Sequence, residues 1–479
     1  MSDFERGGNV IYNDRADTIF HDVPADIHLP DDIEVTSELV TKLVDIGKSN
    51  LPRYEMLQDY YEGWAVIQQR TKPAHKSNNK LISGYPSYIV DVIQGYFVGK
   101  PVEYSASEDE TDTMDKIQEV FKLNDEQDDN SEIAKICGIK GRAYELVYQD
   151  SEGRTRFNQL EPDNVVYVYD NQINPEPLLA VRWFDEYDIF SGSYTLVAYV
   201  YTREREMLFR EGGNGLVLEY DIPHTFPGVP VIEFKNNDEG LGDFERVLPL
   251  IDAYNKAQSD TANDFEEFTD AILILHEMTA TKPEDIIQLR DEGVILTGQG
   301  QSAGWLIKNM NDVAIENYKD RLDDDIQKFS KVANMSDENF SGNVSGESMK
   351  YKLLALDQLI VTKQRKFKRA LQRRLELITH ILSIKDTEFK YTDIEIKFTA
   401  NKPVNEKDIV ELATNLKGVV SDVTMLTKLT QVTGVPANEE QQRLEEEIDP
   451  YELGGDLYED VEGIREDNQG QPQEVGDED

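Results

Sequence analysis

SGNVSGESMKYKLLALDQLIVTKQRKFKRALQRRLELITHIL, residues 341–382, is the stretch that decides the fold of this chain. It opens with a polar, glycine-bearing loop and then runs without Pro or Gly from Glu347 to Leu382. Its apolar residues recur at spacings typical of one buried helical stripe, namely Leu353, Leu356, Ile360, Phe367, Leu371, Leu375, Ile378 and Leu382. Ser345 and Ser348 supply candidate capping hydroxyls. At about 1.5 Å per residue the predicted helix is roughly 50 Å long, so we interpret it as a spine between parts of the molecule or along a neighbouring subunit.

Composition indicates a large folded protein with an unusually acidic surface. The 479 residues are enough for about three domains, and 94 acidic against 49 basic residues give a formal net charge of -45. Such a surface disfavours general binding to DNA or to anionic membranes, although DNA could still pass it without sticking. No signal peptide is expected at the N-terminus, and the aliphatic run Ala271–Leu275 is too short to span a bilayer. Cys137 is the single cysteine, which fits a reducing cytoplasm and a small buried residue.

The first half of the chain predicts an α+β region. Residues 1–37 read as a loose arm, followed by helices over 37–69, around 88–97, 114–123 and 131–144. Several alternating segments predict an antiparallel, hairpin-rich sheet: Tyr144–Tyr148, Thr155–Leu160, Val165–Tyr169, Leu178–Trp183, Tyr194–Thr202, Glu206–Arg210 and Leu216–Tyr220.

The second half predicts mainly helices. Helices over 241–270 and 311–334 flank a compact insert, 271–310, with a short helix and strands at Val294–Thr297 and Trp305–Ile307. This pattern is typical of a two-helix stalk with a small tip. After the spine helix, 391–399 alternates as a strand, 405–416 and 422–432 read as helices, and a last helix precedes an acidic tail from 449 that we expect to be disordered.

Motifs for catalysis are lacking in the sequence. GYFVGKP resembles a phosphate loop only superficially, because it has one residue too few between Gly95 and Gly99, and Pro101 stands where a magnesium-binding hydroxyl is needed. The histidines are scattered without metal-ligand spacing, and Asp323–Asp325 favours a solvated acidic face over a metal site, since helix neighbours point about 100° apart. We therefore expect no enzyme, no metal and no cofactor.

One basic segment stands out on the predicted spine helix. Its cations are Lys363, Arg365, Lys366, Lys368, Arg369, Arg373 and Arg374. We favour pairing with acidic neighbours in the same or an adjacent subunit, and contact with a polyanion is the alternative.

Three segments resemble the portal proteins of long-tailed bacteriophages, especially those of Gram-positive hosts. They are IVDVIQGYFVGKPVEYS (89–105), which follows an Asn-rich loop, VIEFKNNDEGLGDFERVLPLIDAYNKAQSDTANDFEEF (231–268), and DENFSGNVSGESMKYKLLALDQ (337–358). With their order and spacing the resemblance covers roughly 38–400. Glu347 departs from it, since the family usually has a small apolar residue nearby.

The resemblance implies a portal fold and its domains. These are an arm (1–37), an α+β wing (38–240), stem helices (241–270 and 311–334), a small α/β clip (271–310), a tunnel loop (335–348), the spine helix with a wing strand (349–400), an α-helical crown (401–448) and a tail (449–479). It also implies a ring of usually twelve subunits at one capsid vertex. It further implies a virion protein through whose ring terminase packages double-stranded DNA, which is later ejected. The other partners that the resemblance implies are head-tail connectors, scaffold and major capsid protein, and we expect no membrane partner. Assembly is expected in the host cytoplasm.

The resemblance assigns candidate residues to three of these parts. The tunnel loop contributes Asn339, Phe340, Ser341, Asn343, Val344, Ser345 and Ser348 as the DNA contact. The channel wall of the stem contributes Asp260, Asp264, Glu267, Asp323, Asp324, Lys328 and Lys331. The clip contributes Glu284, Asp285, Gln288, Arg290 and Trp305 as the interface to terminase and connectors.

Ring symmetry gives these residues a physical role. A ring repeats each stem carboxylate as a circle of negative charge that repels phosphate and keeps DNA sliding. A head-completion or scaffold-type structural protein is the alternative, because it would share the acidity and the oligomerisation.

Overall fold

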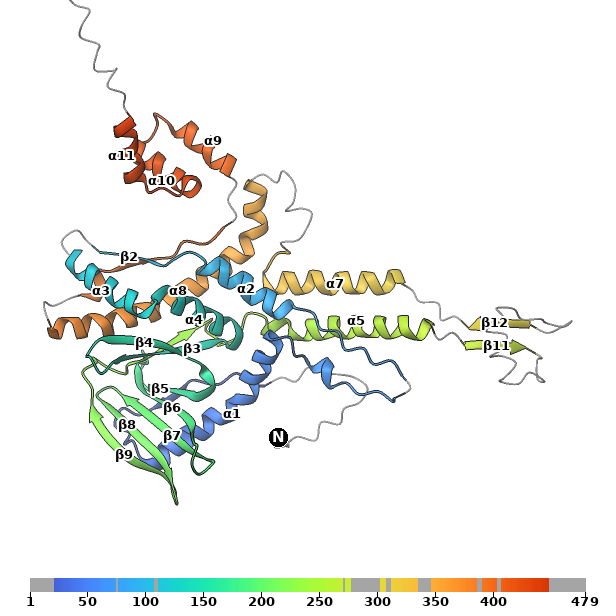
Figure 1. The fold of residues 1–479 in the computed structure, drawn as a ribbon, viewed down its shortest axis with the longest axis horizontal. Helices are drawn as coiled ribbons and strands as arrows, with labels where there is room; N and C mark the ends of the chain where they lie inside the picture. The colour runs from blue at the N-terminus through green and yellow to red at the C-terminus, as the bar shows by residue number, and fades with distance from the viewer. Residues whose placement is uncertain are drawn as a thin grey trace, which may run out of the picture. The chain divides into compact units, whose positions relative to one another are not determined.

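The structure is a computed structural model of the 479-residue chain, and it describes residues 21–74, 76–106, 111–269, 272–276, 302–306, 312–334, 346–385, 390–402 and 406–447. The chain divides into two compact units, Met1–Lys402 and Pro403–Asp479, and each is treated by itself below. Helices and strands are mixed in the first unit, which confirms the α+β class (Figure 1).

A six-stranded sheet forms one layer of the first unit. Its strand order is β1-β5-β6-β7-β8-β9, antiparallel except for the β1–β5 pair. The strands are β1 (Ile27–Leu29), β5 (Val165–Asp170), β6 (Pro177–Asp188), β7 (Ser193–Thr202), β8 (Arg205–Gly212) and β9 (Gly215–Pro223). The predicted hairpins are confirmed. Part of the predicted loose arm is wrong, however, because β1 pairs with β5 and His28 Nδ1 lies 2.8 Å from the Asp170 carbonyl oxygen.

Helix α1 (Ser37–Tyr61) covers this sheet. Its N-cap is Thr36, whose Oγ1 accepts a 3.3 Å hydrogen bond from the Leu39 amide. Val40, Leu43 and Val44 are buried against the strands. The predicted helix over 37–69 is too long, because Gly63 adopts a left-handed φ of 88° and the chain resumes only as the 3₁₀ turn η1 (Val66–Gln69).

A second sheet and several helices, the predicted spine helix among them, contribute to the main core. The sheet has the order β10-β3-β4, so the predicted single sheet is in fact two. Its strands are β3 (Arg142–Gln149), β4 (Thr155–Leu160) and β10 (Val231–Lys235). The helices packed nearby are α2 (Tyr85–Phe97), α3 (Thr111–Asn124) and α4 (Glu126–Lys140). The short 3₁₀ turns of this region are η3 (Pro162–Asn164) and η4 (Glu245–Val247). Helix α4 ends before the predicted Tyr144 because Gly141 has a φ of 86°, and a Cβ there would lie 2.0 Å from the Gly240 carbonyl oxygen.

The spine helix is α8 (Gly346–Lys385), 40 residues long. The predicted stripe is confirmed, since Leu353, Leu356, Ile360, Phe367, Leu371, Leu375 and Ile378 are buried in the main core. The turn η5 (Tyr391–Asp393) follows, and β13 (Glu395–Lys397) pairs with β2 (Glu103–Ser105).

Helices α5 (Leu248–Thr269) and α7 (Asp312–Ser330) lie side by side, as predicted for a stalk (Figure 1). Beyond them β11 (Ile272–His276) pairs antiparallel with β12 (Ser302–Leu306). The aliphatic run at 271–275 thus contributes a strand that its sequence did not indicate. The strand predicted at 294–297 lies outside the described residues.

In the second unit, residues 406–447 are described, and they form three helices. They are α9 (Glu406–Leu416), α10 (Asp422–Thr433) and α11 (Ala437–Glu447), as predicted. Ser421 caps α10 through its Oγ, which accepts a 3.4 Å hydrogen bond from the Thr424 amide. Gly434, with a φ of 72°, ends the same helix.

Candidate functional site

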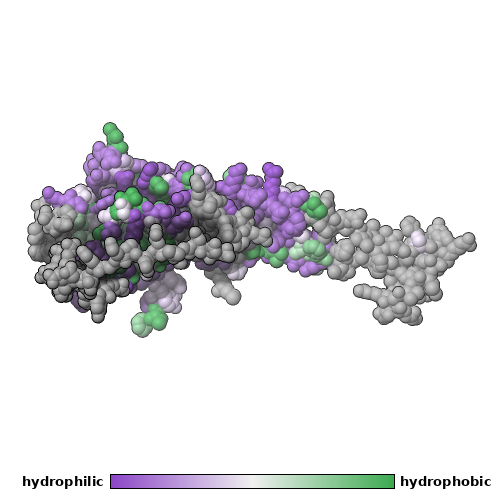
Figure 2. Space-filling model, turned by 90° about the horizontal axis from the view of Figure 1, so that it is seen from above, coloured by the Kyte–Doolittle hydropathy of each residue, from purple (hydrophilic) through white to green (hydrophobic). Residues whose placement is uncertain are grey.

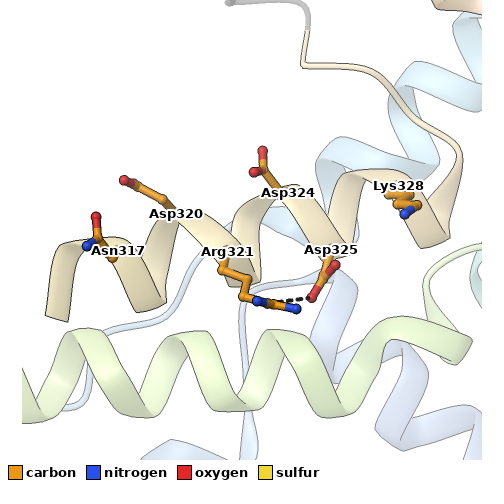
Figure 3. Close-up of a pocket in the computed structure, with 6 residues that line it drawn as sticks. All are labelled: Asn317, Asp320, Arg321, Asp324, Asp325 and Lys328. Atoms are coloured by element: carbon orange, nitrogen blue, oxygen red, sulfur yellow. Dashed lines mark ion pairs between the residues drawn. The ribbon is translucent and has the colours of Figure 1, made fainter. Parts of the chain in front are cut away.

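The outer face of α7 carries a row of polar side chains. Asn317, Asp320, Asp324 and Lys328 recur every three or four residues and so share one helical face. Together with Arg321 and Asp325 they line a shallow hollow. Figure 3 shows Asp320 and Asp324 pointing away from α5, whereas Arg321 and Asp325 lie on the side toward α5. We call this set the α7 face.

Charges on the α7 face are only partly neutralised. Arg321 and Asp325 pair at 3.9 Å. Asp320 and Asp324 are exposed and form no ion pair with another described residue. Lys328 lies at the C-terminal end of the row, with its Nζ 5.8 Å from the ring centre of Phe329. The face therefore presents two carboxylates outward, followed by one cation. Hydrophilic residues cover much of the described surface in the perpendicular view as well (Figure 2).

The adjacent predicted wall residues Asp323 and Asp324 have different surroundings. Asp324 points outward, but Asp323 accepts a hydrogen bond from the Tyr85 hydroxyl on α2. Burial, followed by this hydrogen bond, raises the pKa of Tyr85 well above its usual value. Asp323 therefore fixes α7 to α2. Lys331 is exposed just beyond α7 in a left-handed conformation with a φ of 64°.

Asp260, the first predicted wall residue on α5, is bound by cations of its own chain. Its Oδ1 lies 2.7 Å from Arg70 Nη1 and 3.8 Å from Lys72 Nζ. The Arg70 side chain is 1% exposed and also donates 2.5 Å to the Asn79 carbonyl oxygen. Asp264 is half-buried, and Glu267 is described only by its backbone. Asp260 is thus a partner of the 70–79 segment as well as a surface carboxylate.

A polar row on α5 binds the adjoining 79–83 segment through its backbone. Asn255, Ser259 and Asn263 follow one another at intervals of four residues, and all three are buried. Their side-chain oxygens accept hydrogen bonds from the amides of Ser83 (2.8 Å), Leu81 (2.9 Å) and Asn79 (2.7 Å). Four helical residues rise about 6 Å and two extended residues rise about 6.6 Å, so the two repeats match. We call this set the α5 row.

Sequence reasoning missed the α5 row and most of the α7 face. The signal was present in both cases as small polar residues at a spacing of three or four, the same periodicity that identified the apolar stripe of α8. It was missed because the helical periodicity was followed for apolar residues and not for polar ones.

Most of the predicted tunnel-loop and clip residues lie outside the described residues. Asn339, Phe340, Ser341, Asn343, Val344 and Ser345 lie outside the described residues, as do Glu284, Asp285, Gln288 and Arg290. Ser348 lies in α8 and Trp305 in β12, each described by its backbone alone.

The basic segment of α8 is divided between buried and exposed cations. Lys363 Nζ lies 2.6 Å from Asp243, Lys366 pairs with Asp238, and Arg373 Nη1 lies 2.6 Å from Glu376. Arg374 is fully buried and binds Glu126, Asp129 and Glu145. A polyanion contact is therefore wrong for Lys363 and Arg374, because both are buried and paired within their own chain. In the described part of the chain, Arg365, Lys368 and Arg369 form no ion pair.

The Arg374 cluster holds more carboxylates than cations. Asp129, Glu126 and Glu145 surround one guanidinium, which also lies 4.6 Å from the ring centre of Phe157. Burial, and next the neighbouring charge of Glu145, raise the pKa of Asp129 to about 8. Burial likewise raises the pKa of Glu126.

Comparison with known proteins identifies the family. The family model described as "Phage portal protein, SPP1 Gp6-like" matches residues 41–452, which include nearly all the elements above. The chain belongs to this family of phage portal proteins. The resemblance indicated by the three sequence segments is thereby confirmed.

Two portal proteins illustrate the relationship. The chain is 24% identical over 412 residues to the portal protein of Bacillus phage SPP1, covering 81% of this chain and 80% of that protein. It is 22% identical over 428 residues to the portal protein of Clostridium phage phiCD119, covering 84% and 93%.

Solved structures show weaker similarity. A chain from the neck of an empty GTA particle has a TM-score of 0.42 at 12% identity, covering 74% of this chain and 90% of that one. A chain from the virion of a native gene transfer agent has a TM-score of 0.41 at 12% identity, covering 80% and 93%.

The described part of the chain shows neither a membrane-spanning helix nor a metal-binding cluster. Within the described ranges no helix is long and apolar enough to cross a membrane. Among the same residues, no group of three or more His, Cys, Asp or Glu side chains is arranged to hold a metal ion.

Proposed function

We propose that the chain assembles into a ring, of about twelve copies, that forms a DNA channel at one capsid vertex of a phage virion. In this proposal the protein is structural and not an enzyme. Terminase packages double-stranded DNA through the ring, and the head-tail connectors dock on it later. Membership of the phage portal family supports this function.

The α7 face is the observation that carries the channel proposal. Asp320 and Asp324 point away from α5 without an ion-pair partner among the described residues. A closed ring would repeat each of them as a circle of negative charge, with Lys328 as a basic circle at one end. Because a wall of mostly like charge repels phosphate, DNA would slide without the counterion release that holds it on basic proteins.

The other parts are assigned by the same proposal. Residues 38–240 form the wing, α5 and α7 the stem, 271–310 the clip that meets terminase and connectors, 349–400 the spine helix with a wing strand, and 401–448 the crown. The loop at 335–348 is the narrowest DNA contact. Residues 1–37 and 449–479 are the terminal arm and acidic tail. Scaffold and major capsid protein surround the ring during assembly in the host cytoplasm.

The first experiment is native mass spectrometry with end-on electron microscopy of the full chain over a range of concentrations. We expect a ring of about twelve or thirteen subunits around a central hole. A closed dimer, or a compact assembly without a hole at every concentration, would contradict the channel proposal and favour a scaffold-type structural protein.

A further inference from the structure

A hollow beside the start of α4 contains an incomplete carboxylate site. Glu126 is the first residue of α4, and its side chain is 2% exposed. Its Oε1 accepts hydrogen bonds from the Tyr104 hydroxyl, from Asn130 Nδ2 and, at 3.2 Å, from Arg374 Nη1. Its Oε2 is buried and has no hydrogen-bond partner among the described residues. A carboxylate accepts on both oxygens, so the Oε2 side of Glu126 lacks the donors that its other side has. Oε2 is covered by its own chain, so a further donor reaches it only by displacing the side chains over it. Asp125 and Asp128 are the exposed carboxylates at the mouth of the hollow.

The lining of the hollow fits a guanidinium group. Glu103, Asp125 and Asp128 join Glu126 around it, and Lys122 is the cation of the lining. Glu103 is also paired with Lys397 on β13 at 2.8 Å. Phe121 and Tyr104 add aromatic surface, on which a guanidinium stacks while its planar N–H fork binds a carboxylate. Since no metal-holding group occurs among the described residues, an organic cation suits this hollow better than a metal ion.

Unused arginines of the same chain lie on the opposite face of α8. Arg374 points inward to Glu126 Oε1. Arg365 precedes it by nine residues and Arg369 by five, which places them about 180° and 140° around the helix from Arg374. Both are exposed and form no ion pair with a described residue. The acidic hollow and these arginines therefore belong to different sides of the chain, as a head-to-tail contact between copies requires.

We propose that the hollow at Glu126 binds the guanidinium of Arg365 or Arg369 from a second copy of this chain. This contact rests on the proposed ring. The hollow on one subunit and the two arginines on the next would be one pair of complementary surfaces that close the ring. The exposed arginines of the basic segment thus serve the subunit interface, while the buried cations Lys363 and Arg374 stabilise the main core.

Substitution of the full chain tests the pairing. Glu126→Gln keeps Oε1 for its three donors but puts an N–H donor in place of Oε2, facing the incoming guanidinium. Arg365→Gln with Arg369→Gln removes the other partner from an exposed face. Each change is expected to raise the concentration at which rings dissociate at least tenfold, measured by native mass spectrometry and sedimentation. Combining them should add little, because both remove the same contact.

Controls separate this contact from folding and from the proposed function. Glu132→Gln, an equal change on an exposed part of α4, should leave assembly unchanged. If Glu126→Gln does not fold, Asp128→Arg at the exposed mouth takes its place. It should weaken assembly, and Arg365→Glu with Arg369→Glu should restore it.

Each outcome decides one of the two proposals. If the wild-type chain forms rings and the substituted chains form rings that are equally stable, the Glu126 contact is wrong and the portal function stands. The contact is also wrong if only the Glu126 and Asp128 variants weaken the ring while the arginine variants do not. A wild-type chain that never forms rings would overturn the proposed function itself.

Discussion

Arg374 concentrates the stabilisation of the main core in one side chain. It joins α8 to α4 and β3 through Glu126, Asp129 and Glu145, and it is fully buried. A buried cation of this kind stabilises the fold only while its anionic partners are present, because burying each charge has a desolvation cost that the attraction between them offsets. Removing one member therefore leaves the remaining charges buried and uncompensated.

Substituting Arg374→Ala should lower the free energy of unfolding by about 3–5 kcal/mol, the usual result of breaking a buried ion pair from one side. Urea unfolding followed by circular dichroism measures it. Arg246→Ala, a change at an exposed arginine of η4 that lies in no proposed contact, is the matched control and should stay within about 0.5 kcal/mol. Equal losses for the two variants would show that the cluster contributes no more than a surface arginine.

The raised pKa of Asp129 predicts a pH-dependent stability. The groups that face it are Glu145 on β3, Arg374 on α8 and Glu126 on its own helix. Its pKa is about 8 in the folded chain and 3.8 is the ordinary value. The folded state therefore holds the proton more tightly. The resulting stability is fully present below pH 4 and is lost as the pH rises to 8.

The variant Asp129→Asn removes this proton-binding group. As the pH rises from 5 to 8, the wild type should therefore lose unfolding free energy relative to the variant. A difference that is flat across this range would contradict a raised pKa at Asp129.

At the scale of elements, the α5 row shows how a helix can bind an extended segment. Asn255, Ser259 and Asn263 act as backbone acceptors along α5, and the 79–83 segment supplies every second amide. Asp260 on the same helix pairs with Arg70, which in turn donates to the Asn79 carbonyl oxygen at the start of the segment. The position of this segment therefore depends on α5.

Replacing Asn263→Ala should leave the Asn79 amide without its acceptor, at a cost of about 1–3 kcal/mol for an unsatisfied buried donor. Hydrogen exchange should accelerate for the amides of 79–83 while those of α8 stay unchanged. Glu266→Ala on the exposed side of α5 is the comparison variant. Glu266 also accepts hydrogen bonds from Asn79 and Ser77, but at the surface, so its loss should accelerate exchange less than the loss of Asn263. Unaltered exchange at Asn79 in the Asn263 variant would mean that the α5 row does not hold the segment.

At the scale of the whole molecule, the proposed channel makes the α7 face a test of DNA passage. Asp320→Lys with Asp324→Lys would turn two circles of negative charge into positive ones. We expect DNA packaging to slow or stall, with the effect weakening as salt rises. An in vitro packaging assay with variant particles measures it. Asp45→Lys with Glu55→Lys on exposed positions of α1 makes the same charge change outside the stem, and equal defects in both variants would contradict a channel role for α7.

The proposed tunnel loop gives a second test at this scale. Deletion of residues 342–345, or Asn343→Trp, would change the narrowest contact with DNA while leaving α8 to fold from residue 346 onward. We expect particles of normal mass and composition that package less DNA. Normal packaging in both variants would show that this loop does not meet the DNA.

Periodic signals in the sequence predicted the elements well. The buried stripe of α8, the hairpins β6–β9 and the helices α5, α7, α9 and α10 were all indicated by spacing, because burial on one face requires a regular repeat of apolar residues. Three separate segments that resemble portal proteins also indicated the family, which the family match over 41–452 confirms.

Long-range contacts were decided only by the tertiary structure. Nothing local indicates that β1 pairs with β5, that Asp323 turns toward Tyr85, or that Arg374 is buried while Arg369 is exposed. Each outcome depends on partners more than 100 residues away in the chain. The sequence by itself determined the elements, the acidity and the family, since these depend on local pattern and composition. The tertiary structure decided which charges are neutralised within the chain and which remain unpaired among the described residues, because pairing depends on which distant segments the fold brings together.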